Sequence, residues 1–178
     1  MRRPALPLLA ALCLLALPLQ AQEASLGLRA QALVPMGDLR DLTNGQTGIG
    51  VGLFVEIPLG DAFRLRPTVG ASYFPKKDSL SLSGAPVTVS SVDLMLDALW
   101  FPGETPDQGP YLVGCLGGQM WRISPEGSTA TSATRLGVSG GLGYQFTSHL
   151  AAEARGFWSP VERNLTATGL TVGGVIRF

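Results

Sequence analysis

The strict alternation of the last nine residues is the sequence feature that most constrains the fold of this chain. One face of an extended strand there would carry Leu170, Val172, Gly174, Ile176 and Phe178, because successive side chains in a strand point to opposite faces. The other face would carry Thr171, Gly173, Val175 and Arg177. Soluble domains seldom end on such a strand with a terminal aromatic residue, so we expect its apolar face to meet lipid.

The start of the chain predicts export. Arg2 and Arg3 precede an apolar run over residues 5–19, and Ala21 is a suitable cleavage residue. This arrangement is typical of a signal peptide, and the run is shorter than the roughly 20 residues that a membrane-spanning helix needs. We therefore expect residues 1–21 to be a signal peptide and residues 22–178 to form one domain.

Composition narrows the fold of the exported part. The chain is 46% hydrophobic and only 15% charged, yet no run after residue 21 is long enough for a membrane helix. Only helices and closed barrels satisfy their backbone polar groups inside a bilayer, and 23 glycines and 13 prolines disfavour long helices. A net charge of zero at pH 7 also predicts no nucleic-acid partner.

Alternating segments long enough to cross a bilayer as tilted strands recur along the chain. We place them at 24–34, 47–58, 64–74, 87–101, 111–123, 135–146, 150–159 and 166–178. The connections at 60–61 and 147–149 are short, whereas those at 35–46, 75–86 and 124–134 are longer and polar. The sequence therefore predicts an all-β protein, an eight-stranded antiparallel up-and-down transmembrane β-barrel, with short turns and both termini in the periplasm.

Aromatic residues near the strand ends predict two interfacial girdles, since Trp and Tyr collect at membrane–water interfaces. The Trp and Tyr residues expected there are Tyr73, Trp100, Tyr111, Trp121, Tyr144 and Trp158. We add four phenylalanines to the same girdles: Phe74, Phe101, Phe146 and Phe178. The alternative interpretation is that these rings are core residues of a soluble β-sandwich.

With these features the chain resembles the small eight-stranded outer-membrane barrels of the OmpA/OmpX-like superfamily. The segment from His149 to Trp158, a short turn followed by small and charged residues and then aromatics, is similar to the seventh strand of that family. The resemblance implies location in the bacterial outer membrane. Some relatives carry an additional peptidoglycan-binding module, which we do not expect after residue 178. It also implies that an assembly signal is read by the barrel assembly machinery, carried here by Phe178, Ile176, Val172 and Leu170.

Charged residues on the predicted inner face suggest how the interior is filled. They are Arg29, Glu56, Arg66, Asp93, Asp97, Glu153 and Arg155. An Arg or Lys on the lipid face would cost about 2–4 kcal/mol at the membrane midplane, and an eight-stranded barrel is just wide enough to be filled by side chains. We expect these charges to pair into a plug, with a small gated conduit as the alternative.

Enzyme activity is not predicted. Barrels that trim or acylate lipid A use a serine and a histidine near the outer end, but His149, the one histidine of the chain, lies in a predicted periplasmic turn. Nucleophilic serine chemistry therefore lacks a base at the outer end. We predict no catalytic, cofactor or metal site, and we interpret Cys115 as a packing residue.

The predicted function is a structural or surface-interaction role through the loops 35–46, 75–86 and 124–134. The expected partners are outer-membrane lipids and lipopolysaccharide, which Lys76 and Lys77 could contact through its phosphates, and an extracellular ligand that the loop sequences do not identify. The alternatives are a narrow channel for small solutes or ions and a lipid A-modifying enzyme.

Overall fold

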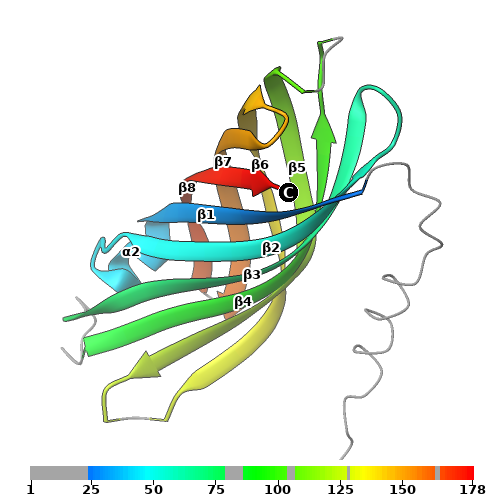
Figure 1. Ribbon diagram of the computed structural model, residues 1–178. Helices are drawn as coiled ribbons and strands as arrows, with labels where there is room; N and C mark the ends of the chain where they lie inside the picture. The colour runs from blue at the N-terminus through cyan, green and yellow to red at the C-terminus, as the bar shows by residue number, and fades with distance from the viewer. Residues whose placement is uncertain (1–23, 79–85, 104–106, 128, 163–164) are drawn as a thin grey trace, which may run out of the picture.

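The chain folds into a closed barrel of eight antiparallel strands (Figure 1). The computed structural model describes residues 24–78, 86–103, 107–127, 129–162 and 165–178, so the predicted signal peptide, residues 1–21, lies outside the described residues. The elements are β1 (Ser25–Met36), α2 (Gly37–Thr43), β2 (Gly48–Pro58), β3 (Phe63–Asp78), β4 (Pro86–Trp100), β5 (Gly109–Pro125), β6 (Thr131–Thr147), β7 (Leu150–Glu162) and β8 (Leu165–Arg177). The predicted fold class is confirmed.

Closure of the barrel is made by β1 and β8, which pair from Gly27 opposite Arg177 to Met36 opposite Thr168. Beyond β8 the backbone N–H of Phe178 donates to the carbonyl of Leu26 at 2.8 Å. Each strand also pairs with its neighbour in sequence, so the sheet has no open edge. This arrangement satisfies the backbone inside a bilayer.

The outer surface is a belt of exposed apolar side chains. On β2, Ile49, Val51 and Leu53 are 66%, 63% and 57% exposed, whereas Phe54 and Glu56 on the opposite face are buried. Strands β4 and β6 alternate in the same way. The residues predicted as an assembly signal also face outward, namely Leu170, Val172, Ile176 and Phe178. An apolar surface of this extent around a closed sheet is suited to lipid.

The two ends of the barrel differ in their connections. We call the end with the start of β1 and the end of β8 the terminal end, and the opposite end, where α2 lies, the loop end (Figure 1). Strand β3 continues to Asp78 and β6 begins at Thr131, so the loops predicted at 75–86 and 124–134 are shorter than expected. Polar sequence at these strand ends was interpreted as loop, although a barrel strand can extend beyond its apolar belt.

Helix α2 occupies the predicted loop 35–46. It is flanked by residues with positive φ, Gly37 at 53°, Asn44 at 51° and Gly45 at 68°, and the backbone N–H of Gly45 donates to the carbonyl of Arg40 at 2.8 Å. In the part of the chain that the structure describes, no helix is both long and apolar enough to cross a membrane.

The predicted aromatic girdles are partly wrong. Tyr73, Trp100, Tyr144 and Trp158 lie on the outer surface, each 42–45% exposed, but Tyr111 and Trp121 are 1% exposed and lie inside the barrel. Phe74 and Phe101 are also interior. The error arises in β5 because its inner face is apolar as well, so alternation alone did not show which face meets lipid. Leu112, Leu116 and Met120 occupy the outer face of β5.

Tryptophan fluorescence can test the corrected positions. In single-tryptophan variants reconstituted into bilayers with brominated lipids, Trp100 and Trp158 should be strongly quenched because they are exposed on the outer surface. Trp121 should be quenched much less, since its ring is inside and its Nε1 donates to Ser159 Oγ at 3.1 Å. Equal quenching of all three would place Trp121 on the lipid face and contradict the register of β5.

Candidate functional site

The middle of the barrel is crossed by an ion-pair layer, which we define as Arg29, Arg66, Asp97, Glu153 and Arg155 together with Tyr111. Asp97 on β4 is its central acceptor: Oδ2 lies 3.1 Å from Arg66 Nε, 2.9 Å from Arg155 Nη2 and 3.4 Å from Arg29 Nη1. Strands β1, β3 and β7 each supply one of these arginines. The layer therefore joins opposite walls of the barrel.

Glu153 on β7 is the second acceptor of the layer. Its Oε1 accepts from Arg66 Nη2 at 2.5 Å and from the Tyr111 hydroxyl at 2.7 Å, and its Oε2 pairs with Arg155. Arg66 is fully buried, and its guanidinium lies 5.0 Å from the centre of the Phe54 ring. Buried charges with several charged partners hold one geometry strongly, because the loss of any partner leaves a charge unpaired.

A second group of charges lies nearer the terminal end, around Glu56. Arg64 Nη1 is 2.7 Å and Arg177 Nε 3.0 Å from the Glu56 carboxylate, and Arg66 Nη1 is 3.9 Å away. Arg64 also lies over the Phe101 ring and pairs with Asp107 at 3.4 Å. Arg66 thus connects the two groups of charges.

Sequence reasoning missed Arg64 and Arg177 as interior charges. In both cases the alternation of side chains along the strand indicates the inner face. Arg64 has the same parity as Arg66 on β3, and Arg177 shares a face with Thr171, opposite Ile176. Both residues lie at strand ends, within one residue of the end of β3 or β8.

The seven predicted interior charges are all buried in the structure, with at most 9% exposure. Six of them form ion pairs: Arg29, Glu56, Arg66, Asp97, Glu153 and Arg155. Asp93 does not, since among the described residues no hydrogen bond or ion pair reaches its carboxylate. It borders a cavity instead.

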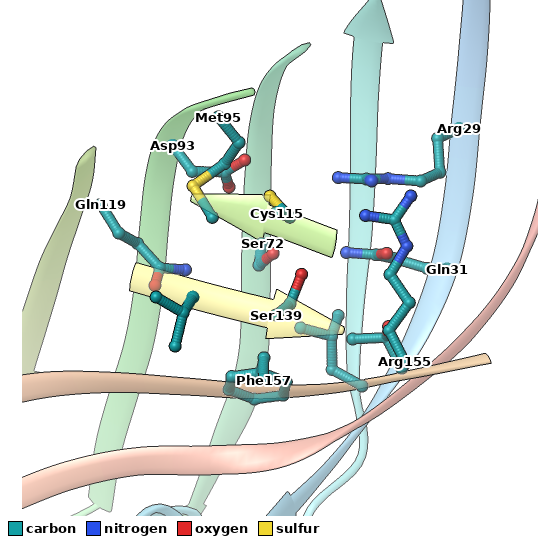
Figure 2. A pocket seen from close by; sticks show the side chains of 13 residues that line it. Arg29, Gln31, Ser72, Asp93, Met95, Cys115, Gln119, Ser139, Arg155 and Phe157 are labelled. Atoms are coloured by element: carbon teal, nitrogen blue, oxygen red, sulfur yellow. The ribbon is translucent and has the colours of Figure 1, made fainter. Parts of the chain in front are cut away.

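That cavity lies beside the ion-pair layer and has a volume of about 50 Å³ (Figure 2). Arg29 and Arg155 contribute to its wall, as do Asp93 and Cys115. Its other polar lining residues are Gln31, Ser72, Gln119, Ser139 and Thr171. A cavity needs about 10–15 Å³ for one water molecule, so this one has room for a few water molecules or a ligand of similar size.

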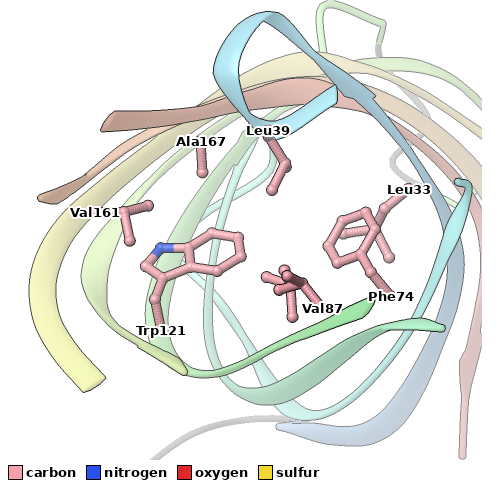
Figure 3. Close-up of a cluster of buried hydrophobic side chains, with 8 residues drawn as sticks. Leu33, Leu39, Phe74, Val87, Trp121, Val161 and Ala167 are labelled. Atoms are coloured by element: carbon pink, nitrogen blue, oxygen red, sulfur yellow. The ribbon is translucent and has the colours of Figure 1, made fainter. Parts of the chain in front are cut away.

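An apolar cap fills the barrel at the loop end (Figure 3). We define it as the buried side chains Leu33, Leu39, Phe74, Val87, Val89, Trp121, Val161 and Ala167. Leu39 is the member from α2, and it is fully buried. Figure 3 shows it reaching from the helix into the barrel toward the other cap residues. The cap fills the loop end with packed hydrocarbon, whereas the ion-pair layer places charged groups across the interior.

Two polar contacts tether α2 and its preceding residue to β8. Asp38 Oδ2 accepts from the backbone N–H of Thr166 at 2.9 Å and from its hydroxyl at 3.1 Å, and the Thr168 hydroxyl donates to the carbonyl of Met36 at 3.0 Å. The backbone hydrogen bond from Thr166, followed by the hydroxyl bond, lowers the pKa of the exposed Asp38 carboxyl. This tether therefore stabilises the folded position of α2 above the ordinary carboxyl pKa and is lost as the pH falls.

Hydrogen exchange can follow this tether. After correction for intrinsic exchange rates, the Thr166 amide should be more protected at neutral pH than in acid, because protonation of Asp38 removes its acceptor. The Asp38→Asn variant should show little of this pH dependence. Identical profiles for the two proteins would contradict the assigned contact.

The side chains with catalytic or metal-binding potential do not lie together in one site. His149 lies in the β6–β7 turn at the terminal end, with Nδ1 3.2 Å from the carbonyl of Arg177. Cys115 is a free cysteine in the wall of the cavity. Within the described ranges, no group of His, Cys, Asp and Glu is suited to hold a metal ion. Lys76 and Lys77 belong to β3, and their contact with lipopolysaccharide stays a prediction.

Comparison with known proteins agrees with this architecture. No protein-family model matches the chain, and no curated protein sequence matches it. The N-terminal β-barrel domain of Pseudomonas aeruginosa OprF is 17% identical, with a TM-score of 0.59 over 89% of this chain and all of that domain. Ail, the attachment invasion locus protein of Yersinia pestis, is 15% identical, with a TM-score of 0.58 over 87% of this chain and 97% of Ail.

Neisserial surface protein A is similar to the same degree, with 17% identity and a TM-score of 0.57 over 88% of this chain and all of that protein. A major outer membrane protein of Thermus thermophilus has a TM-score of 0.50. The chain therefore has the fold of the small eight-stranded outer-membrane β-barrels. These comparisons agree with the predicted location in the bacterial outer membrane.

Proposed function

We propose that this protein is a small outer-membrane barrel that acts at the cell surface through its loop end, in a structural or binding role, while its interior offers solutes no continuous path across the membrane. The observation that carries the proposal is the position of Arg66. This fully buried side chain on β3 pairs with Asp97 on β4 and with Glu153 on β7. The ion-pair layer therefore spans the interior instead of lining an open path.

The apolar cap supports the same conclusion from the other end. Leu39 packs into the barrel mouth, and ions or polar solutes would lose their hydration among hydrocarbon side chains. With the interior filled at two levels, the surfaces left for macromolecular partners are the loops and the belt. Ail has been solved in complex with a heparin analogue, sucrose octasulfate, so a barrel of this fold can bind a ligand. For the present chain a loop-bound partner remains part of the proposal.

A complementation experiment separates the two roles at the loop end. Cells that lack the protein would be given the wild type or a variant with residues 126–130 replaced by Gly and Ser, after both proteins are shown to reach the outer membrane folded. A binding role predicts that the loop variant does not restore the phenotype of cells that have the wild-type protein. A purely structural role predicts that the loop variant restores this phenotype fully. If either protein restores the phenotype only to the extent that it increases solute uptake by the cells, the proposal is contradicted.

A narrow channel is the second candidate, and one observation favours it. The cavity beside the ion-pair layer is lined by Asp93, whose carboxylate has no ion pair among the described residues, as a carboxylate in an interrupted water path would. The lipid A enzyme is the third and weakest, since His149 lies at the end opposite α2. Mass spectrometry of lipid A from expressing cells should show no change in acyl chains, and a lost or added chain would overturn this part of the proposal.

A further inference from the structure

The environment of Asp93 is unusual for a buried carboxylate. The residue is only 9% exposed, and within the described residues it has no ion pair or hydrogen bond. An unpaired charge in the interior is costly and calls for an explanation. The neighbouring strand makes room for it, because a Cβ at Gly70 would lie 2.6 Å from Asp93 Oδ2. The carboxylate is accommodated there without a direct hydrogen-bond or ion-pair partner among the described residues.

A cationic group borders the same cavity from β1. Arg29 is the most weakly held arginine of the ion-pair layer, with Nη1 3.4 Å from Asp97 Oδ2 and with Nε lacking a hydrogen-bond partner among the described residues. Figure 2 shows Arg29 and Asp93 on different sides of the cavity, with the Cys115 and Ser139 side chains between them. The cavity thus has a negative pole at Asp93 and a positive side at Arg29 and Arg155.

Neutral polar groups complete the wall between these poles. Gln31, Ser72, Gln119 and Ser139 offer amides and hydroxyls, which can donate or accept as a ligand requires. The volume of about 50 Å³ limits the occupant to a few non-hydrogen atoms, about the size of a small water cluster. A drug-sized or sugar-sized molecule is too large.

We propose that this cavity is a binding site for a small zwitterion of the amino-acid type, with its ammonium group at Asp93 and its carboxylate at Arg29. A cation would pair with Asp93 alone and an anion with Arg29 alone, whereas a zwitterion can pair with both. The proposal goes beyond the surface role, because it assigns a ligand to the barrel interior.

Entry of the ligand from the loop end requires α2 to move. The helix closes that end through Leu39 and the two tethers to β8, and a glycine lies at each of its ends, Gly37 and Gly45, where the backbone can change its angles at low steric cost. The helix is therefore the lid of the proposed site. Access should increase when the tether or the cap contact is removed.

The first experiment is equilibrium dialysis of radiolabelled glycine against the folded protein from outer membranes, reconstituted in nanodiscs. We expect saturable binding of one glycine per chain, with competition by serine or alanine and much weaker competition by acetate or methylammonium. Absence of saturable binding at millimolar glycine would overturn the proposal. Equal competition by acetate or methylammonium would overturn the assignment of two poles.

Variants locate the site. Asp93→Asn and Arg29→Gln should each weaken glycine binding about tenfold or more, because each removes a charge-assisted contact. Asp107→Asn, which changes an exposed acid near the terminal end, is the matched control and should bind like the wild type. All variants would first be checked for the heat-modifiable gel shift of a folded barrel. Unchanged affinity in folded Asp93→Asn would overturn the proposal.

Cys115 provides a second measurement inside the cavity. The rate at which a small neutral thiol reagent modifies it, followed by mass spectrometry of the Cys115 peptide, should rise in Leu39→Ala. Saturating glycine should lower that rate in the same variant. If glycine binds but does not change the rate in a variant whose Cys115 reacts, the ligand lies elsewhere and the assignment to this cavity is wrong.

Discussion

The Arg66→Ala variant should be less stable than the wild type by about 3 kcal/mol, the lower end of the range for breaking a buried ion pair by removing one partner. Arg66 pairs with Asp97 at 3.1 Å and Glu153 at 2.5 Å. Its removal leaves these carboxylates to the remaining arginines, Arg29 and Arg155, and opens a void beside Phe54. The free energy of unfolding would be measured by urea titration in detergent micelles, with gel mobility as the readout.

Two further variants test the cause of that loss. Arg135→Ala removes an exposed arginine whose Nη1 donates to the neighbouring carbonyl of Thr134, and it should change stability by no more than about 0.5 kcal/mol. Adding Glu153→Gln to Arg66→Ala should recover part of the loss, because the Oε1 that loses its contact with Arg66 then belongs to a neutral amide. If Arg66→Ala is as stable as Arg135→Ala, the ion-pair layer does not hold the barrel together.

The Gly141→Ala variant should be destabilised by about 2–3 kcal/mol, as expected for overpacking against a rigid neighbour. A Cβ at Gly141 would collide with the backbone of β7, where it meets the carbonyl of Ala154 and lies 2.7 Å from the Cα of Arg155. Backbone atoms of a paired strand cannot move aside as a flexible side chain can. The methyl group would therefore push β6 from β7 and shift Arg155 in the ion-pair layer.

Gly140→Ala, one residue earlier on the same strand, is the matched control. Its Cβ would point outward, with the nearest atom, the carbonyl oxygen of Val113, 3.7 Å away. We expect a change within about 0.5 kcal/mol in the same urea titration. Equal effects of the two substitutions would mean that the assigned faces of β6 are wrong.

The barrel itself could be predicted from sequence because its two environments select different residues. On β2 the outer positions are branched apolar residues and the inner ones are mostly glycine, so alternation gave both strand and face. On β5 the inner face also carries large apolar residues such as Tyr111 and Trp121. There the alternation predicts a strand but not which of its two faces meets lipid.

Helix α2 was missed for a different reason. Its seven residues are too few for a helix to be stable by local propensity, since isolated helices shorter than about 12–15 residues are marginal in water. Its stability comes from the packing of Leu39 into the barrel, which depends on strands far away in sequence. That contact is visible only once the barrel is closed.

The candidate site was predicted in its residues but not in its pairing. Parity indicated that Asp93 and Asp97 share the inner face of β4, yet Asp97 contacts three arginines and Asp93 has no ion pair among the described residues. Which charges meet depends on the tilt and register of strands across the barrel. Alternation within one strand carries no information about that relation.

Planar-bilayer conductance of the folded protein tests the closed interior most directly. A heat-modifiable gel shift would first establish that the sample is a folded barrel. The ion-pair layer and the apolar cap predict bilayers without discrete current steps, both for the wild type and for Arg66→Ala, in which the cap is intact. Reproducible steps from the folded wild type would show that the interior charges line a continuous water path, and the closed-barrel account would be wrong.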